Sequence, residues 1–268
     1  MFRSQPTVAY RLSAIIALLT AITTAGGLFI DGLYRDNALA TAAWQGTDLA
    51  TLAVGVPLLV AGLILSARGS VRGQLIWLGM LDYTLYNYAY YLFGAAFNRF
   101  FLIYVALFTL SIFALIFALA KVDVEGLRQR FRAGTPVRGI AGYMVFVALG
   151  IGGLWIGQSL SFVVTGQVPQ FIVDVAHPTS IVFALDLSLV VPFLIVGAVW
   201  LWQRRGWGYL LATILSVKGA VYMLALVAVS LVSAQAGFAE GLAQLPLWGA
   251  LGLGFVAATG FLLWGVRE

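Results

Sequence analysis

The chain has 268 residues, of which 62% are hydrophobic and only 9% are charged. Water-soluble domains average about 25% charged residues, so this composition excludes a soluble globular protein and predicts an integral membrane protein. There are no cysteines, which excludes disulfides, thiolate metal sites and cysteine nucleophiles. The net charge of +5 resides in short segments between apolar runs, a pattern that sets membrane orientation and does not indicate a nucleic-acid partner.

Unbroken apolar runs predict membrane-spanning helices, because the hydrocarbon core is about 30 Å thick and a helix rises about 1.5 Å per residue. A transmembrane β-barrel would instead show alternating segments of about ten residues. We therefore predict an all-α integral membrane protein with eight transmembrane helices: Ala9–Ile30, Thr47–Ala67, Gly73–Phe97, Phe100–Ala120, Gly139–Thr165, Thr179–Trp202, Gly206–Val232 and Leu245–Val266.

The first apolar run has an alternative interpretation as a cleaved signal peptide, since it follows a basic start and contains small residues near Ala25. We favour an uncleaved span, because the apolar stretch continues to Ile30 and the internal repeat described below requires it.

The charges between the predicted spans indicate orientation. Twelve basic residues fall on one side: Arg3, Arg11, Arg68, Arg72, Lys121, Arg128, Arg130, Arg132, Arg138, Arg204, Arg205 and Arg267. The other side holds Arg35 and Arg99 with the acids Asp31, Asp36, Asp48, Asp174 and Glu240. By the positive-inside rule, both termini face the cytoplasm of a plasma membrane of bacterial type. Trp44 and Trp77 are expected at the membrane interfaces, where amphipathic rings are favoured.

The chain also resembles itself. Thr51–Leu75 aligns without a gap with Asp186–Leu210, at an offset of 186 − 51 = 135 residues. The shared positions include Pro57 with Pro192, Gly62 with Gly197 and Gly73 with Gly208. This predicts two parallel four-helix repeats, residues 1–120 and 139–268, joined by a basic linker, 121–138, that contacts anionic lipid. Pro57 and Pro192 would kink the equivalent second helices.

Three ionisable residues lie inside predicted spans and more than one helical turn from either end: Asp82, Asp186 and Lys218. Helix rise places each of them roughly 12–20 Å from the cytoplasmic end, in one central slab. The repeat offset places Lys218 opposite Tyr83, so we predict an Asp82–Lys218 contact with Asp186 as a second partner. The polar residues expected to line this centre are Tyr83, Tyr86, Asn87, Tyr90 and Tyr222 on the third and seventh spans and, more peripherally, Gln158, Ser159, Ser161 and Ser188.

Two functions fit a charged centre within a membrane. The first is a small permease or proton- or cation-coupled transporter, in which Asp82 binds the ion and Lys218 is its internal counter-ion. The second is a non-catalytic scaffold or accessory subunit in which the ion pair only holds helices together. An enzyme is disfavoured, because lipid chemistry would need titratable groups clustered at one interface and the sequence has none. The expected partners are the lipid bilayer and a small molecule or ion.

A lysine on the seventh span and an aspartate on the third resemble microbial rhodopsins, in which a lysine holds retinal. Ile214 stands where that family carries an aspartate four residues before the lysine, and the eighth span and the repeat also depart from its pattern. We therefore expect no cofactor. We expect no metal site either, because His177 is the only histidine and is predicted to be a surface residue. Small residues four apart predict helix-packing surfaces, at Ala148 with Gly152, Gly153 with Gly157 and Gly254 with Ala258.

Overall fold

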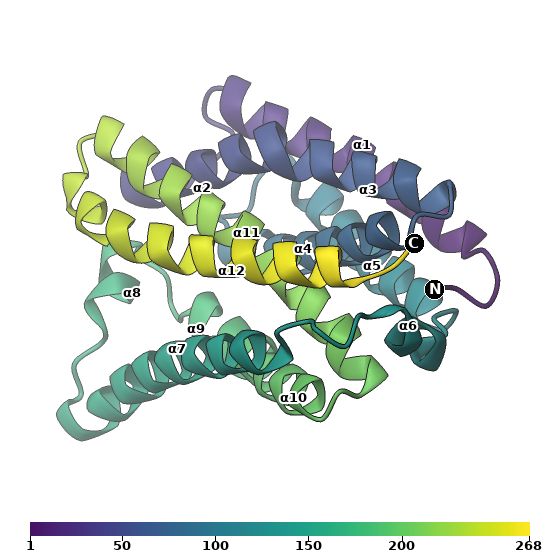
Figure 1. The fold of residues 1–268 in the computed structure, drawn as a ribbon. Helices are drawn as coiled ribbons and strands as arrows, with labels where there is room; N and C mark the ends of the chain where they lie inside the picture. The colour runs from purple at the N-terminus through teal and green to yellow at the C-terminus, as the bar shows by residue number, and fades with distance from the viewer.

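Helices account for most of the chain, and the structure has no β-sheet. The computed structural model describes residues 1–268 (Figure 1). In chain order the elements are α1 (Thr7–Phe29), α2 (Ala38–Ala50), the π-helix η1 (Thr51–Gly55), α3 (Val56–Ala67), α4 (Val71–Gly94), α5 (Phe101–Leu119), α6 (Val124–Arg130), α7 (Val137–Thr165), α8 (Gln170–Asp174), α9 (Ile181–Leu185), the π-helix η2 (Asp186–Val190), α10 (Val191–Trp202), α11 (Gly206–Gln235), the 3-10 helix η3 (Ala239–Gln244) and α12 (Leu245–Gly265). The predicted all-helical architecture is confirmed.

Seven helices are long and apolar enough to cross a membrane: α1, the continuous helix from α2 through η1 to α3, α5, α7, the helix from α9 through η2 to α10, α11, and the helix from η3 to α12. The second of these begins at Ala38, which is 47 − 38 = 9 residues before its predicted start. Trp44 and Asp48 therefore lie inside a helix, each only 1% exposed, so Asp48 is not one of the exposed charges between spans with which it was grouped.

The remaining predicted span, α4, is less apolar because it carries Asp82, Asn87 and five tyrosines. It is nevertheless an interior helix, since 16 of its 24 residues are buried where α3, α5 and α11 pack against it. Trp77, predicted at the interface, is fully buried, and its indole N–H donates to the Ser13 hydroxyl at 2.9 Å. Polar side chains on α4 are covered by protein, which is the condition for holding them at membrane depth.

The second interior helix is α11, which packs against α2, α4, α10 and α12. Within the apolar stretch of each helix, 56% of the residues of α11 are buried, against 17% for the segment that contains α12. α4 and α11 therefore form the middle of the bundle (Figure 1).

The two predicted proline kinks coincide with the two π-helices. Pro57 and Pro192 are the second residues of α3 and α10, directly after η1 and η2. Proline cannot donate to the carbonyl four residues earlier, and its ring crowds that carbonyl. The helix instead forms a wider π-turn before each proline, with hydrogen bonds between residues five apart: the Val56 N–H donates to Thr51 O, and the Val191 N–H donates to Asp186 O. The π-helices begin 186 − 51 = 135 residues apart, and α4 and α11 begin 206 − 71 = 135 residues apart.

Both termini lie at one end of the bundle, where the linker binds them (Figure 1). Antiparallel bridges join Phe2 to Val122 and Phe131 to Val266. The Arg267 N–H also donates to Arg130 O at 2.9 Å. Segment 121–138, the predicted linker, is therefore held to both termini by backbone contacts.

Glu268 closes the same end by capping α4. Its carboxylate accepts the Val71 N–H at 2.7 Å, the Ser70 hydroxyl at 3.0 Å and the Arg72 N–H at 3.3 Å. Partial burial opposes ionisation, but these donors hold the pKa of Glu268 below its usual value. The positive end of the α4 helix dipole also favours a negative charge here.

At the opposite end, loops distant in sequence meet. His177 Nε2 lies 3.5 Å from Asp36 Oδ1, and their side chains are 14% and 3% exposed, so His177 is not the surface residue predicted. The Asn37 amide donates to Asp174 O at 2.8 Å. These contacts hold the α1–α2 loop against the segment that follows α8.

The small-residue pairs behave differently from one another. Gly152 packs against Val191 and Gly254 against Tyr143, while Ala148 and Ala258 are buried. Gly153 and Gly157 instead face open space, so the predicted packing surface at that pair was wrong.

Gly46 permits the close approach of α2 to α11, because a Cβ atom there would lie 2.5 Å from the Val229 Cα. We expect Gly46→Ala to force the two helices apart and to destabilise the fold by about 1–3 kcal/mol. Gly153→Ala is the matched control, since its Cβ meets nothing within 4 Å. Thermal unfolding in detergent, followed by size-exclusion chromatography, measures both variants; equal melting temperatures would contradict the contact.

Candidate functional site

The charged centre is built where α4 touches α11. Gly79 lacks a side chain at the crossing, and a Cβ there would lie 2.5 Å from the Val217 Cβ. Asp82 follows Gly79 by three residues on α4, and Lys218 follows Val217 directly on α11. This close approach places an acid of the first half beside the lysine of the second.

Lys218 is nearly enclosed, with a side chain 9% exposed. Its Nζ lies 3.7 Å from Asp82 Oδ2 and 4.2 Å from the centroid of the Tyr86 ring. The contact predicted between Asp82 and Lys218 is therefore confirmed. The two groups form an ion pair without a hydrogen bond: Lys218 donates none, and Asp82 Oδ2 is buried without a hydrogen-bond partner. The ring of Tyr86 offers the ammonium a cation–π contact in addition.

Asp186 is held more tightly. It is the first residue of η2 and is 6% exposed. Its Oδ1 accepts the Tyr86 hydroxyl at 2.7 Å, and its Oδ2 accepts the Trp155 indole N–H at 2.9 Å. Both carboxylate oxygens are thus occupied, and Tyr86 connects this acid to the lysine side of the centre. Tyr222 packs edge-on against Tyr86, with centroids 5.2 Å apart.

The charges in this centre do not balance. Two carboxylates, Asp82 and Asp186, accompany one ammonium, Lys218, and no other cationic side chain forms an ion pair with either acid. With all three groups ionised the centre carries a formal charge of −1. A net charge enclosed by helices is costly, so the centre favours an added proton or cation.

The structure brings together only some of the predicted lining residues. Tyr83 bonds to the Thr51 hydroxyl at 2.6 Å, and Tyr90 packs on Trp44 with centroids 4.6 Å apart. The Asn87 amide nitrogen is buried without a partner. Of the peripheral residues, Ser159 and Ser188 are exposed and bond to their own helices, so they do not line the centre.

Trp155 was missed by the sequence prediction, although it donates directly to Asp186. No sequence signal points to it, because a tryptophan on an apolar helix is expected at a lipid interface as readily as in a core.

A second buried acid was also missed. Asp48 on α2 is 1% exposed and accepts hydrogen bonds from the hydroxyls of Tyr34 and, at 2.9 Å, Tyr91. Gly27 on α1 passes against the carboxylate, and any side chain there would collide with it. No lysine, arginine or histidine forms an ion pair with Asp48, unlike Asp36 or Asp82.

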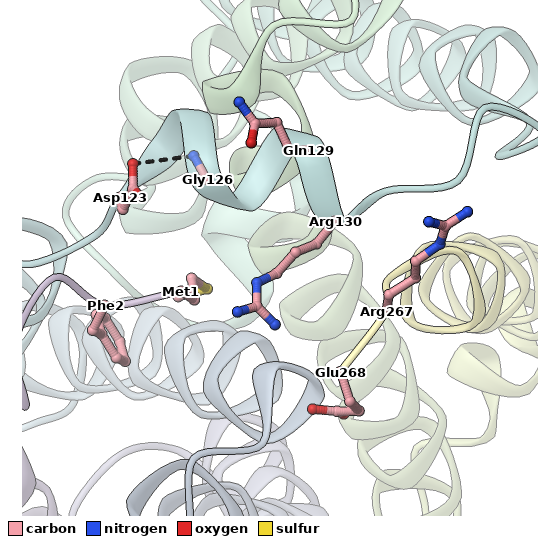
Figure 2. A pocket seen from close by; sticks show the side chains of 8 residues that line it. All are labelled: Met1, Phe2, Asp123, Gly126, Gln129, Arg130, Arg267 and Glu268. Carbon is pink, nitrogen blue, oxygen red and sulfur yellow. Dashed lines mark hydrogen bonds between the residues drawn. The ribbon is translucent and has the colours of Figure 1, made fainter.

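A cavity of about 530 Å³ lies at the end of the bundle that holds the termini (Figure 2). Arg130, Arg267 and Glu268 surround it, and Asp123 at its rim caps α6 through the Gly126 N–H at 3.1 Å. None of the residues of the charged centre lines it. Arg130 belongs to segment 121–138, for which contact with anionic lipid is the predicted role, and Arg267 belongs to the C-terminal segment.

Comparisons with models of known families, with curated proteins and with solved structures found no match. No group of three or more His, Asp or Glu side chains is placed to hold a metal ion.

Removing the ammonium alone should be costly, because it leaves two acids without compensation. We expect Lys218→Met to destabilise the protein by roughly 3 kcal/mol, and Asp82→Asn in the same chain to restore part of that loss. Lys121→Met is the control, since Lys121 is the only other lysine and is exposed. Chemical denaturation in mild detergent measures the series. If Lys218→Met were as stable as Lys121→Met, the ion pair would contribute nothing to the free energy of unfolding.

Proposed function

We propose that the chain is a small permease or proton- or cation-coupled transporter of a plasma membrane of bacterial type. One observation carries the proposal: two carboxylates, a buried Asp186 and an Asp82 whose side chain is 22% exposed, accompany a single, nearly enclosed ammonium. The excess negative charge favours binding of a proton or cation. Movement of the Lys218 ammonium toward the carboxylates would favour its release. Seven apolar helices are consistent with membrane insertion.

We further propose that α4 is an eighth span and that residues 1–120 and 139–268 are parallel repeats with both termini in the cytoplasm. Matching bounds at an offset of 135 support the duplication: η1 with η2, and α3 with α10. The same offset relates Thr51 to Asp186 and Tyr83 to Lys218. In the first repeat Thr51 and Tyr83 are joined by a hydrogen bond. The equivalent positions in the second repeat are Asp186 and Lys218, two charged residues of the centre. Transport sites tend to lie between such repeats.

The two acids would divide the work. Asp82 is the exchangeable group, because its side chain is 22% exposed and its Oδ2 has no hydrogen-bond partner. Asp186 is the fixed counter-charge, because Tyr86 and Trp155 occupy both of its oxygens. An incoming proton or cation competes with Lys218 for Asp82, and the displaced ammonium remains near Asp186 and the Tyr86 ring.

Movement would come from the irregular helices. A π-helix followed by proline is a point where a helix can change direction, because the regular hydrogen-bond ladder is already interrupted. η2 carries Asp186 itself, so bending at η2 changes the distance between Asp186 and Lys218. Tyr222 of α11 packs edge-on against Tyr86 and adds its hydroxyl to the centre, whereas the amide of Asn87 on α4 is buried without a hydrogen-bond partner and would reach a solute only after the helices move.

A second candidate is a scaffold or accessory subunit in which the centre only fixes helix packing. It is favoured by the complete hydrogen bonding of Asp186, which is what a static contact between helices requires.

The two functions separate on Asp82→Asn. For a transporter, we expect proteoliposomes with the wild-type chain to change internal pH when challenged with Na⁺, K⁺ or small amines, and the variant to respond like empty liposomes while remaining folded. Asp31→Asn is the matched control, because Asp31 is exposed. Wild-type flux in Asp82→Asn would refute the role of Asp82. A lower yield and melting temperature, with no flux in the wild type either, would favour the scaffold.

A further inference from the structure

Asp48 lies apart from the charged centre and has a different environment. It sits on α2, 1% exposed, between the Tyr34 hydroxyl on Oδ2 and the Tyr91 hydroxyl on Oδ1. Gly27 of α1 closes the third side, since a Cβ there would overlap the carboxylate. The surrounding aromatic rings pack directly on one another: Trp44 lies 4.8 Å from Tyr91, centroid to centroid.

No positive charge faces this acid. The titratable side chains placed around it are tyrosines of the α1–α2 loop, α4 and α5: Tyr34 and Tyr91 donate to the carboxylate, and Tyr88 and Tyr104 pack on the Tyr91 ring. α11 meets α2 nearby through backbone contact at Gly46 and Val229. An enclosed carboxylate without a cation costs several kcal/mol even after relaxation. Neutral hydroxyl donors offset only part of this cost.

The hydroxyl of Tyr91 has two acceptors within reach. It lies 2.9 Å from Asp48 Oδ1 and 3.2 Å from the backbone oxygen of Trp44. Its hydrogen can therefore point to the carboxylate or to the carbonyl. When it points to Trp44 O, the Tyr91 oxygen is free to accept a hydrogen bond from a protonated Asp48.

We propose that Asp48 is a proton-binding site, occupied in the resting protein and separate from Asp82, Lys218 and Asp186. In the occupied state the Asp48 Oδ1–H donates to the Tyr91 oxygen, Tyr91 donates to Trp44 O, and Tyr34 donates to Oδ2. On release one H⁺ leaves to water, and the Tyr91 hydrogen turns to Oδ1. One O–H bond breaks at Asp48 and no other covalent bond changes.

The site links proton occupancy to two parts of the fold. Tyr34 belongs to the loop between α1 and α2, and Tyr91 to the last turn of α4. Loss of the proton leaves a carboxylate that draws both hydroxyls toward α2. The Trp44 indole N–H and the Tyr104 hydroxyl are buried nearby without partners, so further donors are available to the charged state.

Infrared spectroscopy tests the proposal. At neutral pH the wild-type minus Asp48→Asn difference spectrum should contain the C=O stretch of a protonated carboxylic acid and should shift in D₂O. The Asp48→Asn chain should stay folded, because an amide has the shape of the neutral acid. Tyr91→Phe should keep the band but move its frequency, since the partner of the acid proton is removed. Wild type minus Asp31→Asn should show no such band.

Two results would overturn the site. One is a wild-type minus Asp48→Asn difference spectrum that contains carboxylate stretches and no carboxylic-acid band. That result would mean that Asp48 is ionised in the wild type. The other is a wild-type melting temperature that rises with added Na⁺ or K⁺ while that of Asp48→Asn does not, which would make the occupant a metal cation. If Asp48→Asn fails to fold, Tyr34→Phe and Tyr91→Phe carry the test, because each should shift the same acid band. Neither result depends on whether Asp82 supports transport.

Discussion

An ammonium group enclosed by helices must be balanced by negative charge, and the packing around Lys218 meets that requirement from both halves of the chain. Gly79 allows α4 to approach α11 closely enough for Asp82 to reach the lysine. η2 presents Asp186 to the hydroxyl of Tyr86, whose ring lies against the Lys218 ammonium. The balance is incomplete, since two acids share one cation.

The rest of the bundle makes such a centre possible. α4 carries too many polar side chains to face lipid, so α3, α5 and α11 cover it. The cover is completed at both ends: Glu268 caps the first turn of α4, and the loops that carry Asp36 and His177 close over the other end. The outer helices are apolar on their exposed faces, and the two interior helices carry Asp82 and Lys218 of the charged centre.

Much of this arrangement follows from the sequence, and the exceptions have physical causes. Helix rise and the repeat offset are enough to place Asp82 beside Lys218. The burial of Asp48 was missed because the predicted span began only at Thr47, which left the alanine-rich stretch from Ala38 outside the helix. Asn37 is in fact an N-cap whose side chain accepts the Ala40 N–H, and Asn before an apolar run is a recognisable helix start.

Side-chain partners across helices were harder to predict. Tyr83 adjoins Asp82 but is turned about 100° around α4, toward the hydroxyl of Thr51. The π-helix that presents Thr51 inserts a residue into the helical repeat, which a periodicity of 3.6 cannot anticipate. Trp155 reaches Asp186 only because α7 packs against η2, a tertiary contact without a local sequence signature.

The most direct test of the central electrostatic claim is solid-state NMR on protein with isotope-labelled lysine side-chain nitrogen and aspartate carboxyl carbon. The chain has only two lysines, Lys121 and Lys218, so the buried signal is assigned by its loss in Lys218→Arg. The account predicts a charged ammonium with strong dipolar coupling to an aspartate carboxyl, weakened in Asp82→Asn. A Lys218 nitrogen that is neutral, or that shows no coupling to any aspartate, would contradict it.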